Sequence, residues 1–188
     1  KSNPDKSLSS WMSSIDDSRS LNTISIPGTH DSAATHSLLD IAGKCQDLSI
    51  SQQLEAGARF LDFRLVNYKG SLCLYHGSIN QNLSFADSLK SLYSFLEDHP
   101  SETILLSIKE EDDAKGDTSS FESLLQKEIK KNSSYWITDS TYPSNLGKAR
   151  GKIVLLSRYS SSTIGVPLYK GWKDSLSKGT SNTFDISS

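Results

Sequence analysis

Two short apolar runs constrain the fold of this chain more than any other feature. "TILLSIKEE" (103–111) and "KIVLLSRYS" (152–160) begin as continuous runs of Ile, Leu and Val and become charged toward their C-terminal ends. Such runs are typical of strands buried on both faces, as in a parallel sheet covered by helices. Three more segments have strand character: "NTISIPG" (22–28), "ARFLDFRLV" (58–66) and "SLCLYHG" (71–77).

Helical patterns lie between these strands. "SFADSLKSLYSFLEDHP" (84–100) has apolar residues at helical spacing, with Ser84 as candidate N-cap and Pro100 as a stop. The spacing in "TSSFESLLQKEIKK" (118–131) and the closing glycine of "SISQQLEAG" (49–57) indicate two more helices. Because strands and helices alternate along most of the chain, we predict an α/β fold with a mainly parallel sheet.

Composition limits the class of protein. The chain has 188 residues with 20 basic and 22 acidic side chains, which suits one domain and argues against nucleic acid as a partner. It has no apolar run long enough to span a bilayer. Two sequons, at Asn82 and Asn132, fit a secretory route, so we expect a secreted protein. Cys45 and Cys73 are either one disulfide or two buried thiols.

Polar side chains that can do chemistry gather toward the C-terminal ends of all five predicted strands. These ends share one face in a parallel α/β fold, and active sites collect there. We therefore expect them to meet at one rim: His30, Asp31, Asp62, Arg64, His76, Lys109, Glu110 and Arg158. The other two histidines, His36 in a polar loop and His99 beside a helix-ending proline, are expected to have no catalytic role.

The combination of His30, His76 and Arg64 favours phosphodiester cleavage. Two imidazoles can take a proton from a nucleophile and give one to a leaving group near neutral pH. An arginine offers a planar fork of donors to a phosphate. Acyl transfer and a zinc site have little support, because the chain contains no G-x-S-x-G, H-E-x-x-H or C-x-x-C motif.

Five motifs, in order, resemble the strand-end motifs of secreted, bacterial-type phosphatidylinositol-specific phospholipase C, the family built on the X-box: "SIPGTHDSAATH", "LEAGARFLDFRL", "LCLYHG", "SETILLSIKEE" and "ARGKIVLLSRYS". The resemblance runs from about Leu21 to Tyr159. It implies a TIM-type (β/α) barrel. Because a closed barrel takes about 250 residues, we expect only the N-terminal half to two-thirds of it here, in one domain (1–188) that is incomplete at its C-terminus.

The resemblance also implies a reaction and roles for residues. Phosphatidylinositol would be cleaved to diacylglycerol and inositol 1,2-cyclic phosphate, without a metal or other cofactor. His30 would be the general base and His76 the general acid, supported by Asp31. Arg64 would bind the phosphate, and Asp62 would hold that arginine and the surroundings of the nucleophile. Two further cations would hydrogen-bond the inositol hydroxyls: Lys109 and Arg158.

Two other classes stay open at this point. One is a metal-dependent glycerophosphodiesterase or sphingomyelinase-D-like barrel, although Arg64 stands where such a site would need a carboxylate. The other is an X-box domain that binds a lipid headgroup without turnover.

Leu38, Leu39 and Ile41 either insert into a membrane interface or pack inward as a short helix. We expect a monomer with peripheral membrane contact.

Overall fold

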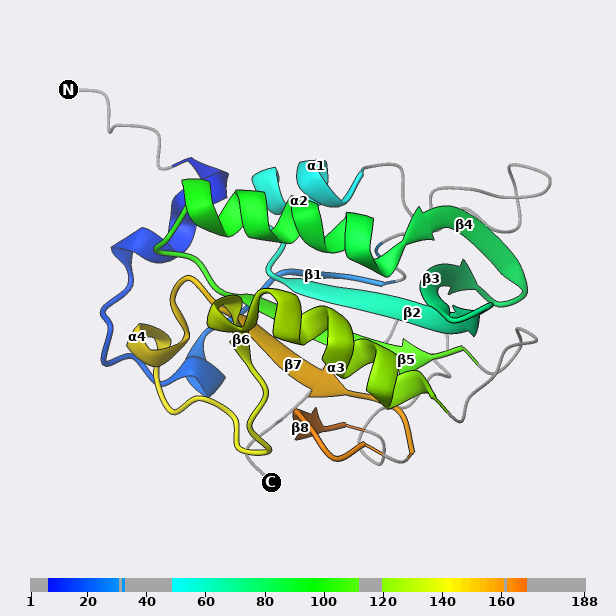
Figure 1. Cartoon of the computed structure of the whole chain (residues 1–188). Helices are drawn as coiled ribbons and strands as arrows, with labels where there is room; N and C mark the ends of the chain where they lie inside the picture. Colours follow the sequence, from blue (N-terminus) through cyan, green and yellow to red (C-terminus); the bar gives the residue numbers. More distant parts are fainter. Residues whose placement is uncertain (1–6, 31, 33–48, 112–119, 161, 169–188) are drawn as a thin grey trace, which may run out of the picture.

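The computed structural model describes residues 7–30, 32, 49–111, 120–160 and 162–168 (Figure 1). Its helices are α1 (Ile50–Glu55), α2 (Phe85–Asp98), α3 (Phe121–Lys131) and α4 (Leu146–Ala149), with 3₁₀ turns at Leu8–Ser14, Leu21–Thr23 and Ser133–Tyr135. Its strands are β1 (Gly28–Thr29), β2 (Phe60–Tyr68), β3 (Ser71–His76), β4 (Ile79–Ser84), β5 (Ile104–Glu110), β6 (Trp136–Ile137), β7 (Ile153–Ser157) and β8 (Val166–Pro167).

All these strands belong to one sheet. The order is β4-β3-β2-β5-β7-β6, and β1 pairs with β2 while β8 pairs with β7. The pairs β1·β2, β2·β5, β5·β7, β6·β7 and β7·β8 are parallel, whereas β3 and β4 form antiparallel pairs. The mainly parallel α/β architecture predicted from the sequence is therefore confirmed. Among the described residues, no helix has the length and apolar character of a bilayer crossing.

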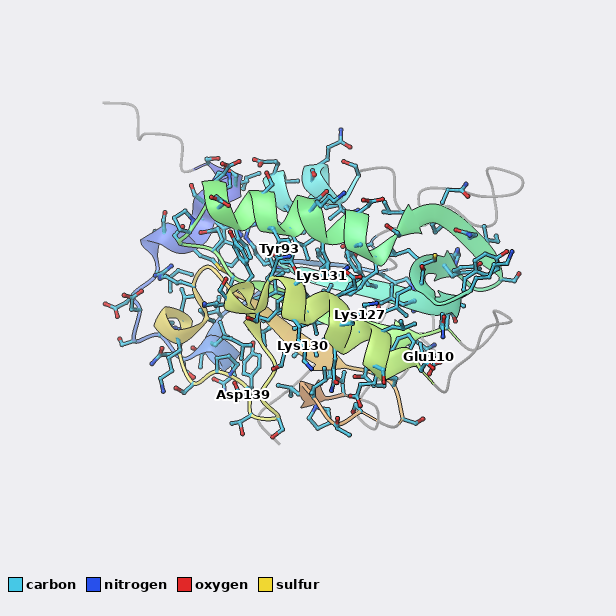
Figure 2. All side chains as sticks on the ribbon, viewed as in Figure 1. Tyr93, Glu110, Lys127, Lys130, Lys131 and Asp139 are labelled. Atoms are coloured by element: carbon cyan, nitrogen blue, oxygen red, sulfur yellow. The ribbon has the colours of Figure 1, made fainter. Side chains whose placement is uncertain are left out.

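The helices α1, α2 and α3 pack on one face of this sheet, and α2 and α3 lie in front of it in Figure 1. Local signals explain their bounds: the Ser84 hydroxyl accepts the Asp87 amide at the start of α2, and Ser49 forms a capping box with Gln52 at the start of α1. The exposed side of α3 carries Lys127, Lys130 and Lys131 (Figure 2). Its buried side packs on the sheet through Phe121, Leu125 and Ile129.

The opposite face of the sheet changes character along the strands. Because side chains alternate between faces, every second residue of β2, β5 and β7 lies on this face. The row nearest the strand starts is apolar and contains Phe60, Leu105 and Val154. The next row contains Asp62, Ser107 and Leu156. The last row, at the C-terminal ends, is cationic, because Arg64 pairs with Lys109 and the Arg158 amide donates to the Ile108 carbonyl.

The N-terminal segment is fastened to the other end of the strands. Arg59 is fully buried and donates to the carbonyls of Leu8 and Ser9 while its Nη2 lies 2.9 Å from Glu102 Oε1. Arg150 donates to the Met12 carbonyl at 3.0 Å. This arginine-held end is therefore structural, and it lies away from the cationic row.

Two strand predictions are wrong in detail. The sequence predicts a strand over 22–28, but only Gly28 and Thr29 pair with β2, because Pro27 has no amide to donate to a ladder. The segment 71–77 is expected to run parallel to the others, but β3 returns antiparallel from a tight turn after β2. The sequence reading misses the polar strand β4, because this strand depends on its pairing with β3.

Candidate active site

A buried carboxylate, Asp62, is the centre of the site. Its side chain is 1% exposed, and one imidazole and two guanidinium groups surround it. Oδ2 lies 3.2 Å from His30 Nδ1 and 3.4 Å from Arg64 Nε, and Oδ1 lies 3.3 Å from Arg158 Nη1. This buried carboxylate is paired rather than isolated, and the guanidinium groups beside it are the donors that carboxylates and phosphates bind. The site is therefore suited to an anion.

The segment that carries His30 is hydrogen-bonded through Ser32 to both the amide and the carbonyl of Asp62. The Ser32 amide donates to the Asp62 carbonyl at 2.9 Å, and the Asp62 amide donates to Ser32 Oγ at 2.8 Å. Gln53, buried on α1, donates from Nε2 to the Ser32 carbonyl at 2.7 Å and accepts the Thr29 hydroxyl at 2.7 Å. These bonds hold His30 above Asp62, with 60% of the imidazole side chain exposed.

The orientation of His30 determines which nitrogen can act. Nδ1 faces Asp62 Oδ2, and a carboxylate in that position favours the tautomer with the proton on Nδ1. Nε2 then keeps its lone pair. Arg64 Nη2 also lies 3.5 Å from Nδ1, and His30 and Arg64 both contact Oδ2 of Asp62. This arrangement places a proton acceptor, His30 Nε2, next to a guanidinium that can donate hydrogen bonds to a phosphate.

A second buried carboxylate, Glu111, connects Arg64 with the end of β3. Its Oε2 lies 3.8 Å from Arg64 Nη1 and accepts the Gly77 amide at 3.4 Å. Gly77 follows His76, which is partly buried at the end of β3. Although β3 is antiparallel, β2 runs past the end of β5 before the turn, so β3 returns to the level of the site at His76. The register therefore brings the end of β3, where His76 lies, to the level of Arg64.

The segment after β7 is anchored by α3. Glu122 accepts the Tyr159 hydroxyl at 2.8 Å, the Thr163 amide at 2.7 Å and the Thr163 hydroxyl at 2.9 Å. Burial raises the pKa of Glu122, but these hydrogen bonds outweigh burial and hold the pKa below its usual value. Burial, with Glu122 as acceptor, raises the pKa of Tyr159. Glu122 thereby fixes the chain immediately after Arg158.

The structure brings together His30, Asp62, Arg64 and Arg158, and it sets Lys109 beside Arg64 in register. Glu110 points to the other face, near the start of α3 (Figure 2). Four predicted positions lie outside the described residues: Asp31, Leu38, Leu39 and Ile41. Cys73 is a free, partly buried thiol whose pKa is raised by burial, and Cys45 lies outside the described residues.

Sequence reasoning missed Ser32, Gln53 and Glu111, and it did not name His30 or Arg158 as a direct partner of Asp62. Glu111 carried a signal, because it ends the strand-like run 103–111 on the same face as Lys109. Gln53 carried none, since its partners lie 21 and 24 residues away. Within the described part of the chain, no group of three or more His, Cys, Asp or Glu side chains is arranged to hold a metal ion.

Comparison with known proteins identifies the family. The family model described as "Phosphatidylinositol-specific phospholipase C, X domain" matches residues 18–159. The 1-phosphatidylinositol phosphodiesterase of Listeria monocytogenes is 38% identical over an alignment of 157 residues that covers 78% of this chain and 48% of that protein. The enzyme of the same name from Staphylococcus aureus (strain Newman) is 30% identical over 167 residues, covering 85% of this chain and 54% of the relative.

Solved structures agree with this result. The phosphatidylinositol-specific phospholipase C from L. monocytogenes has a TM-score of 0.71 at 33% identity, covering 81% of this chain and 57% of that one. An S. aureus phospholipase of this type has a TM-score of 0.75 at 30% identity, covering 85% and 56%. The likeness confirms the predicted barrel-type α/β fold. This chain spans about half the length of the curated relatives it matches. The chain belongs to the phosphatidylinositol-specific phospholipase C X-domain family.

Proposed function

We propose that this chain carries the active-site half of a phospholipase C that cleaves phosphatidylinositol to diacylglycerol and inositol 1,2-cyclic phosphate. One observation carries the proposal: Asp62 gathers His30, Arg64 and Arg158 at the strand ends of an X-domain chain. The names of the L. monocytogenes and S. aureus relatives support the same substrate and reaction. A histidine and a cluster of cations are the groups that an anionic phosphodiester requires.

The proposed step is an intramolecular transfer. His30 Nε2 takes the proton of the inositol 2-hydroxyl, and that oxygen forms a bond to phosphorus. The bond from phosphorus to the glycerol oxygen breaks, and protonated His76 gives its proton to that oxygen as diacylglycerol leaves. Arg64 stabilises the charge that builds up on the phosphoryl oxygens, because a guanidinium offers aligned donors. Lys109 and Arg158 are assigned to the inositol hydroxyls.

The two histidines provide the direct test. We expect His30→Ala and His76→Ala each to lower kcat for phosphatidylinositol cleavage by about 10² to 10⁴, because a general acid or base supplies about that much. His99→Ala is the matched control, since His99 stacks on Phe95 near the arginine-held end of the strands. Near wild-type activity in either variant would show that the replaced histidine is not the general base or acid assigned to it. Inositol phosphate binding without any cleavage would favour the headgroup-binding alternative.

The same site predicts activity without a divalent metal. Asp62 already contacts His30, Arg64 and Arg158, so a metal ion would have to displace one of these side chains to use its oxygens. We therefore expect cleavage to continue in excess EDTA. Arg64→Lys should lose most activity, because an ammonium cannot reproduce the guanidinium fork. Activity that EDTA abolishes and added Ca²⁺ restores would instead support the metal-dependent class.

A further inference from the structure

The turn between β2 and β3 projects beyond the sheet edge that carries the site. The last pair between β2 and β5 is Leu65 with Glu110, and β2 continues for three residues to Tyr68. At about 3.3 Å per residue, the strand extends about 10 Å past that pair. In Figure 1 this turn lies at the end toward which β2 and β5 point, opposite the N-terminal segment.

The tip presents an aromatic ring next to a cation. Tyr68 is 43% exposed, and the Lys69 ammonium lies 5.1 Å from the centroid of its ring. Among the described residues, only Tyr68 and Leu8 are large apolar side chains classed as exposed. A tyrosine has an apolar body and a polar end, and a neighbouring lysine adds attraction to anionic lipid. This pair matches the chemistry of a phospholipid headgroup layer.

The backbone of the tip holds the lysine at a disfavoured position. Lys69 and Gly70 have φ of 52° and 82°, which is the type I′ turn of two-residue hairpins. The first position of this turn favours Asn, Asp or Gly, yet Lys69 occupies it. The Gly70 amide donates to Asn67 Oδ1 at 3.0 Å and closes the turn. A charged side chain therefore stands where the backbone alone favours another residue.

We propose that Tyr68 and Lys69 contact the headgroup layer of an anionic phospholipid membrane. The inference rests on the proposed function, because a lipid whose phosphate reaches Arg64 must approach the rim from which the hairpin projects. The net charge of −2 gives the chain no overall attraction to such a surface, so the contact has to be local. The hairpin tip places a cation and an aromatic ring at the end of the strands that carries the site.

Vesicle co-sedimentation with the full chain tests this contact. The vesicles contain phosphatidylcholine with or without phosphatidylinositol. Lys69→Asn suits the turn, so folding is retained, and we expect about fivefold weaker binding to phosphatidylinositol-containing vesicles only. Tyr68→Ser should weaken binding to both kinds of vesicle. Leu8→Ser is the matched control, because Leu8 is 61% exposed at the opposite end of the strands, and we expect unchanged binding.

The outcomes separate this inference from the proposed function. Cleavage of soluble inositol 1,2-cyclic phosphate should be equal in wild type and in all three variants. The inference would be overturned if both tip variants bound vesicles as well as wild type, or if Leu8→Ser lost binding equally. It would also be overturned if the wild-type chain did not bind vesicles. Tip-dependent binding by a wild type that cleaves no phosphatidylinositol would reject the proposed function and leave the contact standing.

Discussion

Replacing Gln53 by leucine should detach the segment that carries the proposed base. Gln53 makes two hydrogen bonds of 2.7 Å to this segment, a buried one to the Ser32 carbonyl and a part-buried one from the Thr29 hydroxyl. A buried carbonyl left without its partner costs about 1–3 kcal/mol and a lost hydrogen bond about 1 kcal/mol, so we expect the closed segment to lose roughly 2–4 kcal/mol. The Ser32 bonds to Asp62 stay chemically intact but are no longer supported from α1.

Two measurements follow from this magnitude. A loss of about 2 kcal/mol raises the population of the open segment about 30-fold, so amide exchange at Ser32 should accelerate by at least that factor. A misplaced general base can cost about 10²-fold, so kcat should fall while KM changes little.

The neighbouring glutamine provides the matched control. Gln52→Leu makes the same chemical change on the exposed side of α1, where the Gln52 side chain accepts the Ser49 amide and, among the described residues, makes no hydrogen bond to the segment above Asp62. The Gln52→Leu change weakens the cap of α1 and leaves the hydrogen bonds of Ser32 and Thr29 intact, so kcat and amide exchange at Ser32 should both stay close to wild type.

The outcome that would refute the reasoning is specific. If Gln53→Leu lowers the melting temperature but keeps kcat and Ser32 exchange at wild-type values, Gln53 contributes to packing and does not position His30. Equal effects of Gln52→Leu and Gln53→Leu would assign the loss to a weakened α1. Recovery of most activity in Gln53→Glu, which keeps the acceptor for Thr29, would assign the larger share to that bond.

Two further predictions concern stability. Glu122 has a depressed pKa in the folded state, so it stabilises the fold above its unfolded pKa and loses this contribution as pH falls through the folded pKa. Glu122→Gln should therefore lower the urea midpoint at neutral pH and converge with wild type in acid, and a constant difference at all pH values would contradict this. Glu102→Gln removes one partner of the fully buried pair with Arg59 and should cost about 3–5 kcal/mol in denaturant unfolding. A cost under about 1 kcal/mol would show that Arg59 is satisfied by backbone carbonyls alone.

The elements that the sequence predicted well are those with a strong local pattern. The apolar runs 103–111 and 152–160 became β5 and β7, and the pattern 84–100 became α2 with Ser84 as its cap. Periodicity and capping depend on neighbours within about four residues, so they are readable without the fold. The cationic ends of β5 and β7 followed from the same local reading.

The strand-like segment 71–77 shows where local reading fails. Its composition suits a strand in either direction, and the direction was decided by the tight turn at Lys69 and Gly70 and by pairing with β2. The polar strand β4 exists because β3 offers it a free edge to pair with. Pairing direction is a property of two strands together, so one strand's residues do not encode it.

By itself, the sequence determined that strands and helices alternate and that His30, Arg64, Lys109 and Arg158 fall at strand ends. Only the tertiary structure decided that Asp62 holds His30 as well as two arginines, and that Gln53 secures the segment above it. The physical reason is distance along the chain. Secondary structure depends on near neighbours, whereas the contact of Asp62 with Arg158 joins residues 96 positions apart that meet only after the sheet has formed.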